Sequence, residues 1–478
     1  MAGIGIKLNK FFEKSSVTSY IVGSGYSVIS TIAPMLVVIG VILIMQAILG
    51  YSDASYSNKQ LFQSTVLYVF IFSLLGSSLL NAVLSKYVSD VIFKEEYDSI
   101  MAAFYLGLAL NLILDCIMFI PFTIHEHFVG KVGIGYILTS IACFLSLSLV
   151  FYTMLYLSLC KDYGKVSLFY IIGMTISVLF SLLLVKVFHV EVTYAMLLSL
   201  TIGFFIIACL GYALLRQYFT KNSGKYKEVF LYICKFWRLI LANFFYTLGL
   251  YIHNFVFWNT SLRNVVVHSF VYAESYDFAT CIAMFTNISA SVIFVALVEM
   301  RFNARYKQYS EAIIGGRLLD ITKTKSRMFR MLADQIMSMV RIQFIISTVV
   351  FLICMLVLQK LGYSGVVIQL YPCLAAGYFI MYIMYSTFLF LYYFNDITGS
   401  LITSFLFVLF TLIFSIISSK LDIIWYGAGL VIGSFIAWTY GYFRLKWLEK
   451  NIEYHIFCNG TILDQVVGDK PTSKVYQK

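Results

Sequence analysis

The sequence predicts an all-α polytopic membrane protein with about twelve transmembrane helices in two bundles of six. Hydrophobic residues make up 61% of its 478 residues and charged residues only 12%, whereas about 25% of the residues in a typical soluble domain are charged. The mean hydropathy is +0.87. Apolar runs of about 20 residues, the length that crosses a bilayer core as a helix, recur along the whole chain.

Clusters of turn-forming and charged residues separate these apolar runs. Lys7, Lys10 and Lys14 precede a first run that is too long for the apolar core of a signal peptide, so it is expected to remain as an uncleaved anchor. The expected spans lie near 22–50, 61–85, 100–121, 134–159, 166–187, 193–215, 236–258, 276–299, 342–359, 365–392, 397–418 and 423–443.

Basic residues alternate in density between successive connections. With the N-terminus in the cytoplasm, the inner segments together carry most of the Lys and Arg residues, and each outer loop carries one. This is the asymmetry of the positive-inside rule, so both termini are predicted to be cytoplasmic. The expected division is a first bundle over 1–218, a linker over 219–235, a second bundle over 236–446 and a tail over 447–478.

The connector over 302–340 is the longest polar segment between two spans. It reads as two amphipathic helices that are broken at Gly315-Gly316. Either anionic membrane lipid or a protein partner would suit its basic face. The candidate docking residues are Arg305, Lys307, Arg317, Lys323, Lys325, Arg327 and Arg330.

Polar residues within or beside the spans are the candidates for function, because burying them in a membrane is costly. The charged ends of Lys235 and Arg238 could instead simply extend to the membrane surface. His253 could instead be a hydrogen-bonded packing residue. Asp277 could instead be exposed to water at the outer end of its span, without a role in a cavity or gate. The full candidate set for a cavity or gate is Asp115, Lys235, Arg238, Asn243, His253, Asp277 and Glu299.

Enzymatic motifs are absent from the sequence. It contains no D-x-D pair, P-loop, HExxH or GxSxG pattern, and its nine cysteines are scattered without a CxxC pair. The net charge of +11 follows from the inner loops and does not indicate nucleic-acid binding. We therefore expect a non-enzymatic protein that needs no cofactor or metal, and passage of a substrate rather than chemistry.

Two stretches resemble the PelG family of exopolysaccharide transport proteins. The N-terminus MAGIGIKLNKFF is similar to the family's opening, and Tyr276-Asp277 begins the second match. That match continues through an apolar span to Phe302, Tyr306, Tyr309 and Gly316-Arg317-Leu318. The resemblance implies a MATE-like flippase fold of the MOP superfamily in the bacterial inner membrane.

The same resemblance implies a polysaccharide substrate and several partners. A PelF-like cytosolic glycosyltransferase would make an N-acetylhexosamine polymer, and PelD-like and PelE-like membrane components would assist its passage. The connector would then be a dock for one of these partners. Alanine at both Asp277 and Glu299 is expected to abolish polymer secretion at normal protein levels.

Two other functions fit the same sequence. One is a lipid-linked oligosaccharide flippase or a drug or ion antiporter, which would work alone and couple to ions through an acid such as Asp115. The other is a scaffold that recruits and activates the glycosyltransferase at the membrane.

Overall fold

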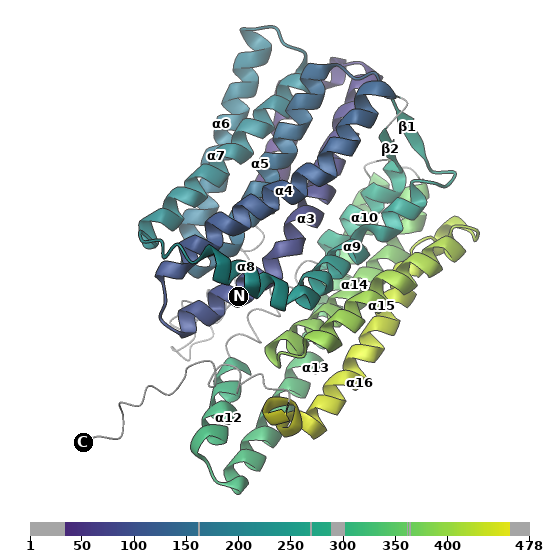
Figure 1. The fold of residues 1–478 in the computed structure, drawn as a ribbon. Helices are drawn as coiled ribbons and strands as arrows, with labels where there is room; N and C mark the ends of the chain where they lie inside the picture. Colours follow the sequence, from purple (N-terminus) through teal and green to yellow (C-terminus); the bar gives the residue numbers. More distant parts are fainter. Residues whose placement is uncertain are drawn as a thin grey trace, which may run out of the picture.

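The computed structural model describes residues 34–160, 163–267, 270–287, 302–360, 362 and 365–458. Within this part of the chain, ten helices are long and apolar enough to cross a membrane. They run roughly side by side (Figure 1). The prediction of a helical polytopic protein is confirmed.

The helices before the linker pack mainly against one another. α5 and α7 form the most extensive contact among them, and α3 and α6 pack on either side of this pair. Phe204 and Met174 are fully buried at the centre of this group. Its elements are the helix Pro34–Ile48, the 3₁₀ turn η1 (Tyr51–Asp53), α3 (Tyr56–Phe93), α4 (Asp98–Phe128), α5 (Ile134–Cys160), α6 (Tyr163–Lys186) and α7 (Val192–Tyr218).

The helices after the linker form a second group. α15 packs between α9 and α16, while α14 contacts α16 and α10. This group and its linker helix comprise α8 (Tyr226–Lys235), α9 (Trp237–Phe257), β1 (Asn264–Val266), β2 (Phe270–Tyr272), α10 (Glu274–Asn287), α12 (Asn303–Gly315), α13 (Leu318–Lys360), α14 (Gly365–Tyr393), α15 (Ile397–Ser418), the 3₁₀ turn η3 (Ile423–Trp425) and α16 (Ala428–Cys458).

The two ends of the molecule differ in structure. At one end, β1 and β2 pair antiparallel, with Asn264 opposite Tyr272 and Val266 opposite Phe270. This hairpin contacts α3 of the first group. At the other end, α8 crosses the lower part of the first group and contacts α3 and α4 (Figure 1). We call these the hairpin end and the linker end.

Most expected spans coincide with observed helices. The spans expected near 61–85, 193–215 and 397–418 lie inside α3, α7 and α15, respectively. The first and eighth expected spans lie partly outside the described residues, which include Pro34–Ile48 of the first and α10 of the eighth. The count of twelve spans and the domain limits therefore stay predictions.

The connector is broken at Gly315-Gly316, as predicted. Its second helix, however, is not separate from the span expected near 342–359. α12 ends at Gly315, and α13 begins at Leu318. α13 then continues without interruption through the expected ninth span to Lys360. We call α12 together with 318–341 of α13 the connector arm.

The apolar side of the connector arm packs against the rest of the second group. Phe302 and Tyr309 of this side are fully buried, and so is Met328 on α13. They lie in one cluster with Phe394, just beyond α14, and with Leu448 on α16. This apolar stripe is therefore used within the protein and does not face lipid.

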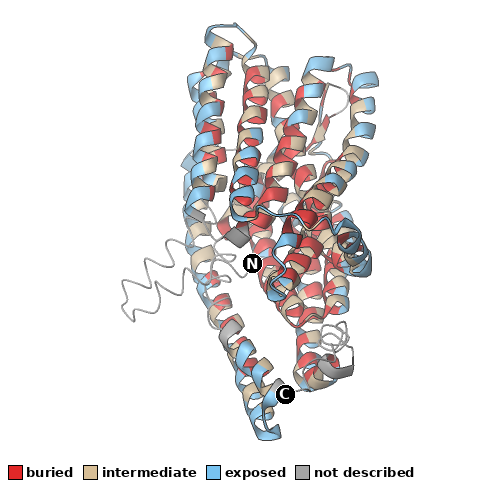
Figure 2. Ribbon diagram, turned by 60° about the vertical axis from the view of Figure 1, so that its left-hand side comes forward, coloured by how far each residue is buried: buried red, intermediate tan, exposed pale blue. Residues whose placement is uncertain are grey.

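Apolar residues also cover the outer faces of the helices. Ile117 on α4, Leu179 on α6 and Leu356 on α13 are each more than 60% exposed. In Figure 2, buried residues lie toward the interior, and exposed residues line the outer faces of the long helices. A bilayer solvates such a surface, whereas water would not.

Candidate functional site

The candidate site is the seam where α3 of the first group meets α9 of the second. Midway along this seam, the side-chain amide of Asn243 donates a hydrogen bond to the carbonyl oxygen of Ser78 at 2.7 Å. Closer to the hairpin end, the rings of Phe72 and Phe255 stack with centroids 6.0 Å apart. Asn243 was a predicted gate residue, and the structure puts it between the two groups.

Tyr68 on α3 joins the first group to the hairpin. Its hydroxyl donates to the carbonyl oxygen of Val271 at 2.6 Å and accepts from the amide of the same residue at 3.1 Å. Its ring stacks on Trp258, with centroids 5.1 Å apart and planes 7° apart. A single side chain thus closes the seam by hydrogen bonds and by an aromatic stack.

Asp277, at the start of α10, holds Trp258 in that position. The indole N–H of Trp258 donates to both carboxylate oxygens of Asp277 at 3.0 Å. The Asn254 side chain and the Ala273 amide donate to the same carboxylate at 2.7 and 2.9 Å. Bonds to an ionised acceptor are the stronger kind, so this carboxylate orders the stack on Tyr68. We call Tyr68, Trp258, Val271 and Asp277 the hairpin-end latch.

Sequence reasoning missed Tyr68 and Trp258 of this site. Tyr68 lies in an ordinary apolar run, so its partner on the hairpin is invisible in the sequence. Asn254 and Trp258 carry a usable signal, because a spacing of four puts both side chains on one side of a helix. With Asp277 opening the next span, that pair predicts a polar contact between neighbouring spans.

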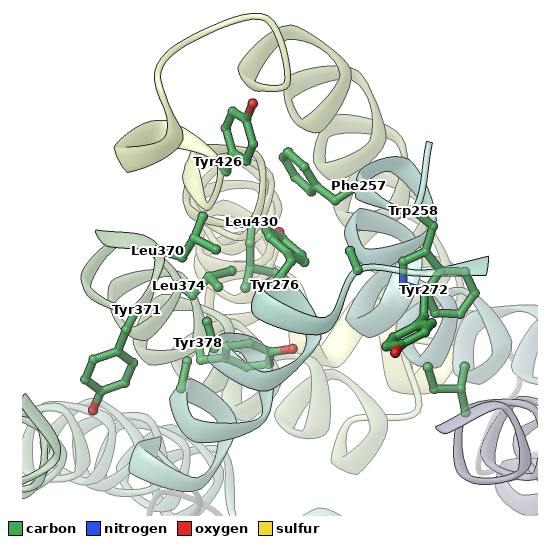
Figure 3. Close-up of a cluster of buried hydrophobic side chains, with 14 of the residues drawn as sticks. Phe257, Trp258, Tyr272, Tyr276, Leu370, Tyr371, Leu374, Tyr378, Tyr426 and Leu430 are labelled. Atoms are coloured by element: carbon green, nitrogen blue, oxygen red, sulfur yellow. The ribbon is translucent and has the colours of Figure 1, made fainter. Parts of the chain in front are cut away.

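His253 lies away from the latch, inside the second group. Its Nδ1 is 2.8 Å from the hydroxyl of Tyr276, and its Nε2 is 3.5 Å from that of Tyr378. Figure 3 shows Tyr276 close to Leu430 and Phe257 in a buried cluster. The surroundings of this fully buried histidine match its alternative role in packing.

Asp115 is fully buried within the first group, on α4. One carboxylate oxygen accepts from Asn111 at 2.9 Å and from Ser148 at 2.6 Å. The other carboxylate oxygen has no hydrogen-bond partner among the described residues, and it faces Gly76 on α3. Asp115 therefore joins α3, α4 and α5, and it does not lie on the seam.

Lys235 and Arg238 lie at the linker end and are exposed. The Lys235 ammonium is 5.7 Å from the centre of the Phe236 ring, and the Arg238 guanidinium donates to Thr398 at 3.4 Å. Nearby, Tyr232 of α8 donates to Asp90 of α3 and so fastens the linker to the first group. Burial and this bond to a carboxylate raise the pKa of Tyr232.

Several candidate docking residues have partners inside the protein. Lys325 forms an ion pair of 2.7 Å with Glu453 on α16. Lys307 lies 4.0 Å from Glu311, and Arg305 donates to Gln308 at 2.9 Å. Glu299, from the gating set, lies outside the described residues.

Metal-ligating side chains do not cluster in the described part of the chain. No group of three His, Cys, Asp or Glu side chains gathers there in a way that could hold a metal ion.

Comparison with known families identifies the relatives of this chain. Residues 1–457 match the family model of PelG, which describes an exopolysaccharide exporter, EPS-E. The chain belongs to the PelG family. No curated protein matches the sequence.

Solved structures similar to this PelG-family chain are transporters. An outward-facing multidrug-resistance MATE-family transporter of the MOP superfamily is 15% identical over 90% of this chain and 96% of its own, with a TM-score of 0.58. The inward-facing form is 14% identical over 82% and 92%, with a TM-score of 0.55. The Vibrio cholerae MATE transporter VcmN in its bent form is 13% identical over 94% and 99%, at 0.57. This PelG-family protein therefore has a MATE-like fold.

The contacts across the seam of this PelG-family protein are fewer than those inside either group. Hydrogen bonds and stacked rings connect the groups at the latch, while most packing contacts lie within each group. An aromatic-lined cavity of about 100 Å³ lies beside Tyr68 in the first group.

Proposed function

We propose that this PelG-family protein passes an N-acetylhexosamine polymer across the bacterial plasma membrane, between its two helix groups and in step with a cytosolic glycosyltransferase. The family and the fold establish a multi-pass membrane protein of the exopolysaccharide-exporter class. The identity of the polymer, the partner enzyme and the route between the groups are what we propose in addition.

The orientation that supports this proposal has the linker end in the cytoplasm. The basic connector arm and the lysines near α8 lie at that end, as the positive-inside rule requires. The hairpin end would then face outward. Because twelve is an even number of spans, both chain termini would then lie in the cytoplasm.

The observation that carries the proposal is the hairpin-end latch. A transporter that alternates between two faces needs a closure that neither group supplies alone. Tyr68 comes from the first group, whereas Val271, Trp258 and Asp277 come from the second. Separating them costs two hydrogen bonds and one aromatic stack, a few kcal/mol in all. Binding of a substrate can supply free energy of this size.

The seam also suits a sugar polymer chemically. Aromatic rings offer flat surfaces for sugar rings, and hydroxyl and amide groups offer hydrogen bonds. Tyr68, Phe72, Phe255 and Trp258 provide the rings, and Asn243 provides an amide. All become available to a substrate once α3 and α9 move apart.

Secretion by variants of Asp277 tests this proposal. Asp277→Ala removes the acceptor that holds Trp258, so the latch loses its order. We expect secreted polymer to fall at least tenfold, with the membrane level of the protein unchanged. Glu299→Ala would be combined with it to test the second predicted gate residue.

Asp422→Ala is the matched control, because Asp422 is an exposed acid on the loop between α15 and α16. This variant should secrete normally. Normal secretion by Asp277→Ala would remove the latch from the mechanism. Transport of a lipid-linked oligosaccharide by the purified protein alone would instead support the flippase function.

A further inference from the structure

The outer face of the connector arm combines exposed leucines with unpaired arginines. Leu318 and Leu319, at the start of α13, are 77% and 79% exposed. Arg327 and Arg330, further along α13, are also exposed, and no ion pair joins either to another described residue. Exposed apolar groups beside unpaired charge are typical of a binding surface.

The geometry of α13 puts Leu319 and the arginines on one side, while Leu318, the first residue of the helix, lies about 100° away from Leu319. At about 100° per residue, Leu319, Lys323, Arg327 and Arg330 fall within roughly 80° of one another around the helix. The buried residues Met328, Leu332 and Met339 fall on the opposite side. The second group therefore covers one side of α13 and leaves the leucine and the cations uncovered. We call Leu319, Lys323, Arg327 and Arg330 the arm face, together with the exposed Leu318 beside it at the tip of the helix.

A shallow groove widens the arm face toward α12. Arg305 of α12 lines it together with Arg327 and Arg330 of α13, and its volume is about 670 Å³. Asp334 is the one acidic residue among the seven that line it. Between 317 and 330, five basic residues accompany one acid. The groove is therefore suited to carboxylates, which arginine binds through two parallel hydrogen bonds.

The bilayer is too far away to cover the leucines. The apolar stretch of α13 begins after Arg341, and Leu319 lies about 33 Å before it at 1.5 Å per residue. Even a tilt of about 40° leaves a height of roughly 25 Å. The polar layer of a leaflet is only about 5–8 Å deep. This distance along α13 favours a protein over a lipid surface as the occupant.

We infer that the arm face docks a cytosolic protein through an acidic segment that places apolar side chains on Leu318 and Leu319. This inference rests on the proposed function for the identity of that protein, which is the glycosyltransferase. It deepens that function in two ways. It assigns part of the binding to Leu318 and Leu319, which are not among the basic candidate docking residues, and it predicts an acidic and apolar binding segment on the glycosyltransferase.

Binding of the purified glycosyltransferase to the full-length protein in lipid nanodiscs tests the inference. Leu318→Gln with Leu319→Gln removes the apolar contact and keeps good helix formers. We expect the Kd for the glycosyltransferase to rise at least tenfold. Leu318→Met with Leu319→Met should stay within about twofold of the unaltered protein, since methionine keeps the apolar contact.

Two further variants separate the contributions. Phe230→Gln with Leu231→Gln changes another exposed apolar pair, on α8, and should leave binding unchanged. Arg327→Glu with Arg330→Glu should slow association and remove most of its salt dependence, because opposite charges steer the encounter.

The outcomes distinguish this inference from the proposed function. Unchanged binding by the glutamine pair, or absence of binding by the unaltered protein, overturns the docking inference. A change in oligomeric state with unchanged glycosyltransferase binding overturns it too, in favour of a second copy of this chain. Lost binding with normal polymer secretion would uphold the docking surface and refute the coupling in the proposed function.

Discussion

The carboxylate of Asp115 illustrates how one residue fixes the packing of three helices. Asn111 and Ser148 donate to one of its oxygens, and Gly76 allows α3 to approach the other. A buried acid in the third span was predicted from the sequence, because an ionisable residue stood inside an apolar run. Ser148 was not predicted as its partner, since it belongs to another helix and resembles many other span serines.

Gly76→Ala should destabilise the protein. A β-carbon at this position would lie 2.5 Å from the carboxylate oxygen of Asp115, which forces α3 away from α4. Overpacking of this kind costs about 1–3 kcal/mol. The measurement is thermal unfolding of the purified protein in detergent. Gly40→Ala is the control, because nothing lies within 4 Å of a β-carbon there. Equal midpoints for the two variants would contradict the close approach.

At the scale of single elements, α13 departs most from expectation. The sequence indicated an amphipathic helix and then a separate span, because the charge density changes sharply at Arg341. The structure keeps one helix, since the apolar stripe of the arm continues into the membrane segment through Met328, Leu332 and Met339. The break at Gly315-Gly316 was predictable because glycine interrupts a helical pattern locally. The continuity was not, because it depends on packing against α14 and α16.

The ion pair between Lys325 and Glu453 fastens this helix to α16. Lys325→Glu brings two acids together and should loosen the arm, so that amide hydrogen exchange in 318–330 becomes faster. The combined Lys325→Glu and Glu453→Lys variant restores the pair and should restore the slow exchange. The pair is partly exposed, so the effect should be about 1 kcal/mol or less. Faster exchange in both variants would show that the pair does not hold the arm.

At the scale of the whole molecule, the fold and the family were predictable, and the seam was not. Hydropathy gives the helices directly, and the N-terminal motif indicates the family that matches residues 1–457. Which helices meet across the groups depends on contacts far apart in sequence. Tyr68 and Val271 are 203 residues apart, and Ser78 and Asn243 are 165 apart. No local pattern encodes such pairs.

A cross-link across the middle of the seam should stop transport. Cysteines at Ser78 and Asn243, in a background without the nine native cysteines, would be joined by a short, cleavable thiol reagent. We expect secretion to fall below about a tenth of its level without the cross-link. A substrate that supplies a few kcal/mol of binding free energy cannot open a seam closed by a covalent bond. Cleavage of the reagent should restore secretion.

Each single cysteine variant is the control, and treatment with the same reagent should leave its secretion at its own untreated level. Full secretion by the cross-linked protein would mean that the polymer does not pass between α3 and α9.

The unbroken course of α13 also makes it a lever. If its membrane part and its outer tip move as one rigid rod, rotation near Arg341 is amplified over about 33 Å. A rocking motion of about 10° in the membrane would sweep Leu319 through roughly 6 Å. A protein held at that tip would be pulled with every cycle, and its own state would in turn resist or favour the rocking. Synthesis and export would then be timed mechanically, with no diffusing messenger between them.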